Sequence, residues 1–341
     1  MSSTDPARTP VTILTGFLGA GKTTLLNRIL QGDHGLRVAV LVNDFGEINV
    51  DSGLIVDIEG ETMALSNGCI CCTIRDDLLE ATVQLMRRPQ PPEYILIEAS
   101  GVSEPAAIAL TFLLPELRPL LQLDGIITVV DAEQVMDLGQ YMDLIYDQIY
   151  AADIVLINKV DLVDAAYLET LREWIRDIVP NARILETVHG EAPLELLLGV
   201  GRFASDPALS HVTPFDPGDF SHGDNPEDAH AHVHRHDHSQ QFSTWSYVTD
   251  RPLALDRFRE AFKAFPTTIF RAKGFIHLAE LPDRRGVFQL TGRRASLTVD
   301  PSWEGKPPLT QLVFIGSPGG LHPAELQGSL DGCIAEASLR M

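Results

Sequence analysis

The sequence has few cysteines, little positive charge and no long apolar run. Its 341 residues include four cysteines, and 26 lysines and arginines stand against 47 acidic residues, giving a formal net charge of −21. A field of that sign repels phosphate backbones and anionic lipid headgroups, so we expect neither nucleic acid nor a membrane as a partner. The acidic surface would concentrate cations, and it is equally consistent with a role in solubility alone.

No segment is typical of a membrane span or an export signal. The most apolar region, residues 106–130, is interrupted by prolines and charged residues such as Pro115, Arg118 and Asp124. The N-terminus, MSSTDPARTP, lacks a basic region followed by an apolar run, so we expect a cytoplasmic protein. In that reducing compartment, clustered cysteines are more often metal ligands or redox groups than disulfides.

Apolar, β-branched runs alternate with helical patterns over the first 200 or so residues. The runs are VTILT (11–15), VAVLV (38–42), YILIE (94–98), GIITVV (125–130), DIVLIN (153–158) and ARIL (182–185). Helical patterns lie between several of them, at 25–30, 77–86 and 165–179. Nearly continuous apolar strands are typical of burial on both faces. The alternation therefore predicts an α/β domain over residues 10–205, with a mainly parallel sheet and helices on both faces.

The composition changes after this domain. Residues 206–240 are rich in His, Asp, Gly and Pro and have no apolar period, which predicts a flexible linker. Strand-like runs follow from residue 242, together with one helical pattern whose apolar face carries Leu255, Phe258, Phe262 and Phe265. We expect a small C-terminal α+β domain over 241–320, a tail over 321–341 and disorder over 1–9.

The segment GFLGAGKTT, residues 16–24, fits the pattern G-x-x-x-x-G-K-[ST] between a strand and a helix, and so predicts a phosphate-binding loop. Its glycines let the backbone turn its N–H groups toward phosphates, assisted by the helix N-terminus. Lys22 is expected to reach the β- and γ-phosphates and Thr23 to hold Mg²⁺. The other residues expected to bind the nucleotide are Gly16, Gly19, Ala20, Gly21 and Thr24.

The segment NKVD, residues 158–161, follows the buried strand DIVLIN. The Asp161 carboxylate can accept two hydrogens from the Watson–Crick edge of guanine, where adenine has the opposite donor and acceptor pattern. Asn158 and Lys159 are expected to flank the base. Although a simple turn at a strand end has the same residues, the position in a phosphate-loop domain favours GTP and GDP over ATP.

The segment EASG, residues 98–101, closes the strand YILIE. Ligands bind at the carboxyl ends of parallel strands, so Glu98 is a candidate for binding Mg²⁺ directly or through water. Gly101 is a candidate for donating its N–H to the γ-phosphate. A capping or salt-bridged role is the alternative for Glu98.

The segment VNDFGEINVDSGL, residues 42–54, contains Asp44, Glu47 and Asp51, and is where a switch segment is expected. We weakly favour Asp44 as the acid that orients the attacking water or contacts metal. A solvated acidic loop has the same composition.

Three cysteines, Cys69, Cys71 and Cys72, lie within LSNGCICC (65–72). A disulfide between such close neighbours is strained, whereas three thiolates and one further ligand suit tetrahedral Zn²⁺ or Co²⁺. Buried free thiols or a redox site are the alternatives. Because the motif lies between the expected switch and the Glu98 loop, we expect nucleotide state and metal affinity to be coupled.

Residues 222–238 of the linker hold six of the eleven histidines, five of them in HAHVHRHDH. Neutral imidazoles on a flexible chain bind Zn²⁺, Ni²⁺, Co²⁺ or Cu²⁺ loosely and exchange the ion quickly, so we expect metal capture here rather than an inert polar linker. The expected ligands are His230, His232, His234, His236 and His238.

Taken in order, GFLGAGKTT, VNDFGEINVD, GCICC, EASG and NKVD make this chain resemble the CobW-type metal-chaperone GTPases, which are relatives of UreG and HypB. The His-rich insert and RAKGFI (271–276) extend the likeness over residues 10–317. The resemblance implies GTP hydrolysis coupled to delivery of zinc, or in some relatives cobalt, to a client metalloprotein. It also implies that Cys69, Cys71 and Cys72 form the internal metal site.

One residue departs from the family pattern. The family typically has Asn-Glu-Phe-Gly in the switch, whereas this chain has Asp44 in place of the glutamate. Two other interpretations remain open: a zinc-buffering protein regulated by GTP, and a metabolic enzyme such as a kinase or an accessory enzyme of cobalamin synthesis. The sequence is compatible with a monomer or a homodimer.

Overall fold

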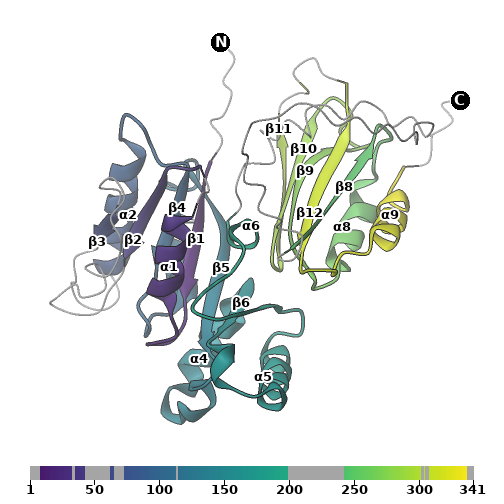
Figure 1. Ribbon diagram of the computed structural model, residues 1–341. Coiled ribbons are helices and arrows are strands. Elements are labelled where there is room, and N and C mark those ends of the chain that lie inside the picture. Colours follow the sequence, from purple (N-terminus) through teal and green to yellow (C-terminus); the bar gives the residue numbers. More distant parts are fainter. Residues whose placement is uncertain are drawn as a thin grey trace, which may run out of the picture.

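The protein contains two β-sheets, each with its own helices (Figure 1). The computed structural model describes residues 8–32, 35–42, 62–64, 73–112, 114–198, 242–300, 303 and 307–335. Among these residues, no helix has the length and apolar character needed to cross a bilayer.

The first sheet has seven strands in the order β3-β2-β4-β1-β5-β6-β7, and all neighbouring pairs are parallel. The strands are β1 (Thr9–Thr15), β2 (Val38–Val42), β3 (Thr62–Ala64), β4 (Tyr94–Glu98), β5 (Leu121–Asp131), β6 (Ile154–Asn158) and β7 (Arg183–Thr187). The predicted parallel sheet is therefore confirmed. The strand order reverses at β1, and in such sheets ligands bind outside the carboxyl ends of the strands at this point.

Helices cover both faces of this sheet, as predicted. Alternate strand residues point to opposite faces, so Leu14 packs on the side of α1 while Ile13 packs on the side of α2 and α3. One face carries α1 (Lys22–Gln31) and α6 (Leu194–Leu197). The other carries α2 (Thr73–Met86), α3 (Pro105–Thr111), α4 (Met142–Ala151) and α5 (Ala165–Ile178).

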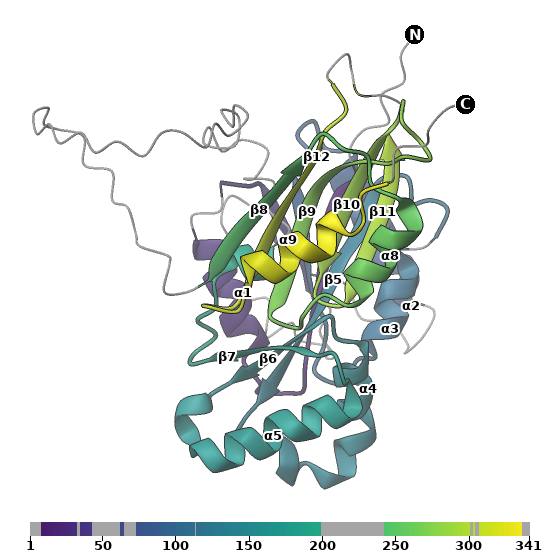
Figure 2. The same ribbon diagram turned by 90° about the vertical axis from the view of Figure 1, so that its right-hand side faces the viewer.

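The second sheet is antiparallel, with the order β11-β10-β9-β12-β8. Its strands are β8 (Ser243–Thr249), β9 (Ile269–His277), β10 (Arg285–Thr291), β11 (Arg294–Asp300) and β12 (Thr310–Gly316). Helices α8 (Leu255–Lys263) and α9 (Pro323–Asp331) lie together on its outer face (Figure 2). The predicted C-terminal α+β domain is confirmed.

Helix α9 corrects the expectation of a tail after residue 320. Leu326 and Leu330 are buried in the core of the second domain, next to Cys333. The helical pattern of this segment is weak, because it is short and mixed and has only two buried leucines, four residues apart. Residues 323–334 therefore belong to the second domain.

A buried ion pair joins the two sheets. The Arg271 guanidinium on β9 donates to the Asp124 carboxylate on β5 at 2.8 Å, and the two side chains are 7% and 8% exposed. Tyr94 Oη also donates to this carboxylate, at 2.7 Å, as does Thr291 Oγ1 at 3.1 Å. We call Asp124, Arg271, Tyr94 and Thr291 the interdomain cluster.

The charges of the interdomain cluster stabilise each other. Burial alone would raise the pKa of Asp124, but the Arg271 guanidinium and the hydrogen bonds from Tyr94 and Thr291 hold that pKa below its usual value. Arg271 also donates to the backbone carbonyls of Leu196 and Leu197, at the end of α6. The second domain is thus attached to β5 and to the chain beyond β7.

Candidate nucleotide-binding site

The predicted phosphate loop, residues 16–24, connects β1 to α1 at the point where the strand order reverses. Gly16, Gly19 and Gly21 have φ angles of 135°, 76° and 102°, a region that side chains disfavour. A Cβ on Gly16 would lie 2.1 Å from the Val129 carbonyl oxygen, and one on Gly21 would lie 2.4 Å from the Asn158 amide. Conformation therefore favours glycine at all three positions, and space also requires it at Gly16 and Gly21. The resulting cradle fits a phosphate group.

Lys22 begins helix α1 and is buried. Its ammonium donates to the carbonyl oxygen of Phe17 within the same loop, at 3.1 Å. The first turn of α1 has no acidic residue and no side-chain cap, so its positive end faces the loop without an opposing charge of its own. Together these groups provide the positive charge that a phosphate chain needs.

Thr23 and Glu98 meet although they lie 75 residues apart in the sequence. The Thr23 hydroxyl donates to Glu98 Oε1 at 2.7 Å, and the Glu98 side chain is buried at the carboxyl end of β4. A hydroxyl and a carboxylate are the oxygen ligands that Mg²⁺ prefers. The two side chains therefore fit a Mg²⁺ ion next to the phosphates.

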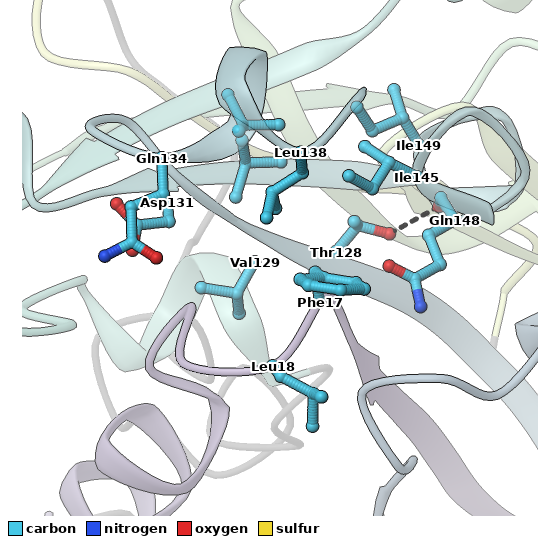
Figure 3. Close-up of a pocket in the computed structure, with 12 residues that line it drawn as sticks. Phe17, Leu18, Thr128, Val129, Asp131, Gln134, Leu138, Ile145, Gln148 and Ile149 are labelled. Carbon is cyan, nitrogen blue, oxygen red and sulfur yellow. Dashed lines mark hydrogen bonds between the residues drawn. The ribbon is translucent and has the colours of Figure 1, made fainter. Parts of the chain in front are cut away.

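Gly101 lies directly against the phosphate loop. A Cβ at this position would approach the Leu18 backbone nitrogen to 2.7 Å, so a larger residue would push the two loops apart. A pocket beside this contact is lined by Phe17 and Leu18 of the phosphate loop and by Gln148 of α4 (Figure 3).

Asn158 lies beneath the phosphate loop at the end of β6 and is buried. Its amide donates to the Ala20 carbonyl at 3.0 Å, and its amide oxygen accepts from the Gly190 N–H at 2.9 Å and from Thr187 Oγ1 at 3.1 Å. One side chain therefore ties the phosphate loop to β7 and the loop that follows it.

Lys159 follows in a left-handed conformation, with a φ of 63°. Its ammonium contacts the Asp131 carboxylate at the end of β5, at 2.6 Å, and Asp131 also accepts from the Glu133 N–H at 3.0 Å. Asp161 is exposed in the short 3₁₀ turn Val160–Leu162. The predicted base-binding residues thus differ: two have fixed contacts within the protein, and Asp161 is open to a ligand.

Several predicted site residues remain predictions. Thr24 is exposed on α1. The predicted switch acid Asp44, the Cys69, Cys71 and Cys72 motif and the histidines His230 to His238 lie outside the described residues. Within the ranges that are described, no three His, Cys, Asp or Glu side chains are grouped to hold a metal ion. The Zn²⁺ site therefore remains a prediction.

Two residues of the site were missed by the sequence analysis. Asp131 ends a buried strand, which is the signal that identified Glu98, and the same argument would have found it. Gln148 lies within the amphipathic helix α4, where no motif distinguishes it. Gln148 is part of the site because it contacts a loop that is distant in the sequence, and a local pattern does not reveal such a contact.

Comparison with known proteins gives two family matches. The model described as "CobW/HypB/UreG, nucleotide-binding domain" matches residues 10–186. The model described as "Cobalamin synthesis protein cobW C-terminal domain" matches residues 242–334.

Individual relatives agree with these matches. The chain is 30% identical to the zinc chaperone CobW of Sinorhizobium sp, over 90% of this chain and 92% of that protein. It is 33% identical to the zinc chaperone YjiA of Escherichia coli, over 90% and 93% of the two chains. It is also 33% identical to the zinc-regulated GTPase metalloprotein activator 1 of Dictyostelium discoideum, covering 83% of this chain and 66% of that protein. Among solved structures, Zn(II)-bound YjiA GTPase from E. coli matches 96% of this chain and 99% of its own, with 26% identity and a TM-score of 0.45.

Proposed function

Because this chain belongs to the CobW/HypB/UreG family of nucleotide-binding proteins, we propose that it is a GTPase that binds Zn²⁺ and transfers it to a client metalloprotein under nucleotide control. The relatives named as zinc chaperones and as zinc-regulated GTPase activators support this proposal. The three thiolates of the Cys69 motif require a reducing compartment, for which we propose the cytoplasm.

The observation that carries the catalytic part is the 2.7 Å hydrogen bond between Thr23 and Glu98 at the N-terminus of α1. It unites a hydroxyl from the phosphate loop with a carboxylate from another strand, next to a buried lysine. A simple anion-binding loop does not need such a carboxylate, because negative charge there repels phosphate. A divalent cation bound there would attract both the carboxylate and the phosphate, and so would offset their repulsion.

In the proposed reaction, water attacks the γ-phosphate of GTP, and GDP and inorganic phosphate are released. Lys22 and the N–H groups of residues 16–24 stabilise the charge on the transferring phosphoryl group. Thr23 and Glu98 would hold Mg²⁺, which would supply further charge neutralisation. Asp161 selects guanine, Asn158 and Lys159 support the base end, and Gly101 donates its N–H to the γ-phosphate.

For the metal, we propose that Cys69, Cys71 and Cys72 hold Zn²⁺ as cargo. Five histidines of the linker, His230 to His238, capture it first and exchange it quickly. Hydrolysis changes the segment between β2 and α2, which contains both Asp44 and the cysteines, and so alters metal affinity.

The test is Zn²⁺ affinity, measured by chelator competition with GDP and then with a non-hydrolysable GTP analogue. We expect a difference of about tenfold or more, equivalent to about 1.4 kcal/mol. The difference should vanish in the Cys69→Ser/Cys71→Ser/Cys72→Ser variant. The matched control is Cys333→Ser, which removes the chain's fourth thiol, buried in the second domain.

Each outcome distinguishes the proposal from its competitors. Equal affinity in the two nucleotide states supports a zinc buffer instead. A preference for ATP over GTP in hydrolysis supports a metabolic enzyme. If the difference in Zn²⁺ affinity between the two nucleotide states persists without the three cysteines, the metal site lies elsewhere in the chain.

A further inference from the structure

The loop after β4, residues 99–104, is held in place by hydrogen bonds from helix α4. We call residues 99–104 the sensor loop, because they include Gly101, which we expect to contact the γ-phosphate. The loop begins with a hydrogen bond from the Ala99 N–H to the Leu14 carbonyl on β1, at 2.8 Å. It then passes against Leu18 of the phosphate loop at Gly101.

Gln148 of α4 contacts the sensor loop at two points. Its amide nitrogen donates to the Gly101 carbonyl at 3.1 Å and to the Ser103 carbonyl at 3.3 Å. Its backbone carbonyl accepts from Thr128 Oγ1 on β5, at 2.7 Å, which anchors this part of the helix to the sheet (Figure 3). The side chain is 1% exposed, so solvent does not compete for these bonds.

A buried glutamine has an energetic cost that apolar residues avoid. The neighbouring inward residues of α4, Ile145 and Ile149, pack in the apolar core with α5. Burying an amide among them is unfavourable unless its hydrogen bonds are made. Here the amide nitrogen of Gln148 donates both of its hydrogen bonds to one loop, and that loop adjoins the phosphate site.

We propose that Gln148 is a positioning residue for GTP hydrolysis, which fixes the sensor loop so that the Gly101 N–H meets the γ-phosphate. This inference rests on the GTPase function proposed above. The bond from Gln148 fixes the peptide plane that follows Gly101, and the Ala99 N–H bond to Leu14 fixes the chain before it, so the Gly101 N–H is restrained from both sides. A fixed donor costs no reorganisation when charge develops on the phosphate.

The sensor loop also contains a buried hydroxyl. Ser103 Oγ is buried and has no hydrogen-bond partner among the described residues. Buried polar groups are normally paired, so a hydrogen bond to this hydroxyl would favour a loop arrangement that gives it a partner.

The experiment compares Gln148→Met with Gln148→Ala. Methionine has a similar volume and no N–H donor, so it separates hydrogen bonding from packing. We expect kcat for GTP to fall about 10- to 100-fold in both variants, because misplacing a group by about 1 Å has that effect. GDP affinity should stay within about twofold of the wild type, because GDP lacks the γ-phosphate, while affinity for a GTP analogue falls.

The matched control is Thr82→Val on α2. Thr82 is fully buried and donates to the Leu78 carbonyl in its own helix at 2.6 Å, so the variant loses one buried hydrogen bond away from the site. It should lose stability without losing kcat. A Gln148→Met protein with normal kcat and normal analogue affinity would overturn the proposal, and so would equal losses for GDP and for the analogue.

Two further measurements keep the test decisive. If the Gln148 variants do not fold, hydrogen exchange of the wild-type amides at 101–104 replaces them: exchange that differs between GDP and the analogue supports the proposal, and identical exchange overturns it. If the wild type hydrolyses no GTP, the GTPase proposal fails by itself. The role of Gln148 is then decided by whether Gln148→Met removes the preference for the analogue over GDP.

Discussion

The nucleotide site and the interdomain cluster both bury charged side chains, but their partners differ in kind. In the interdomain cluster, Arg271 faces the carboxylate of Asp124, and Tyr94 and Thr291 add further hydrogen bonds to it. In the nucleotide site, the buried Lys22 donates to a neutral carbonyl, that of Phe17. The groups that surround the Asp124 carboxylate are fixed parts of the protein. The Phe17 carbonyl, in contrast, is a partner of Lys22 that phosphate can replace.

This difference separates charges that hold the structure together from charges that bind a ligand. A buried ion pair has already compensated much of its loss of hydration, so removing one partner leaves the other uncompensated. A lysine bonded to a carbonyl keeps much of its electrostatic attraction available for an anion. Mutations in the two regions should therefore have opposite effects on stability and on binding.

The largest effect is expected from Arg271→Ala. Because Asp124 would remain buried without its guanidinium partner, we expect the free energy of unfolding to fall by about 3–5 kcal/mol. Denaturant unfolding of the nucleotide-free protein measures this change. The control is Lys263→Ala, which breaks the exposed Lys263–Glu260 pair and should have an effect below about 1 kcal/mol. Similar effects for the two variants would contradict the structural role of the cluster.

Lys22→Ala should show the reverse pattern. We expect affinity for GTP and GDP to fall about 100-fold, equivalent to about 2.7 kcal/mol, because the ammonium no longer reaches the phosphates. Stability without nucleotide should change less than in Arg271→Ala, because the Phe17 carbonyl is an uncharged acceptor, whereas Arg271→Ala leaves the Asp124 carboxylate buried. Fluorescent-nucleotide titration and denaturant unfolding test both statements. A large loss of stability with normal nucleotide affinity would remove the distinction between the two regions.

Glu98→Gln should have an intermediate effect that is specific to the metal. Glutamine keeps an oxygen acceptor for the Thr23 hydroxyl but loses the negative charge that attracts Mg²⁺. We expect the Mg²⁺ concentration for half-maximal GTP hydrolysis to rise about tenfold, or about 1.4 kcal/mol. Removal of Mg²⁺ with EDTA should stop hydrolysis in both proteins. An unchanged Mg²⁺ requirement would argue that Glu98 does not contact the ion.

The smallest effect is a pH dependence of stability, with opposite signs for two interdomain carboxylates. The pKa of Asp124 is lowered in the folded protein, so its stabilisation is present at neutral pH and is lost as the pH falls through the folded pKa. Burial raises the pKa of Asp153, despite its contact with Arg294, so acidification favours its folded form.

Unfolding measured between about pH 6 and 3 tests the two signs. We expect Asp124→Asn to flatten the loss of stability on acidification and Asp153→Asn to steepen it. The same change of slope in both variants would show that the two carboxylates do not differ as the structure indicates.

Much of the nucleotide site follows from short stretches of sequence. The glycines of residues 16–24 and the strand before them predict a cradle, and the structure gives these glycines the positive φ angles that the cradle needs. The switch acid, the cysteines and the linker histidines remain predictions, because they lie outside the described residues. Cys333 is a buried thiol of the second domain, as its isolation from the other three cysteines suggests.

The sequence by itself determined the parallel sheet and the phosphate loop, and it predicts base binding by the turn after β6, because each is encoded by the spacing of nearby residues. Only the tertiary structure decided which distant groups meet. Thr23 contacts Glu98 across 75 positions, Asn158 contacts Ala20 across 138, and Gln148 contacts the sensor loop at Gly101 across 47. These contacts depend on the order in which strands pair, and strand order is set by packing of the whole sheet rather than by any local pattern.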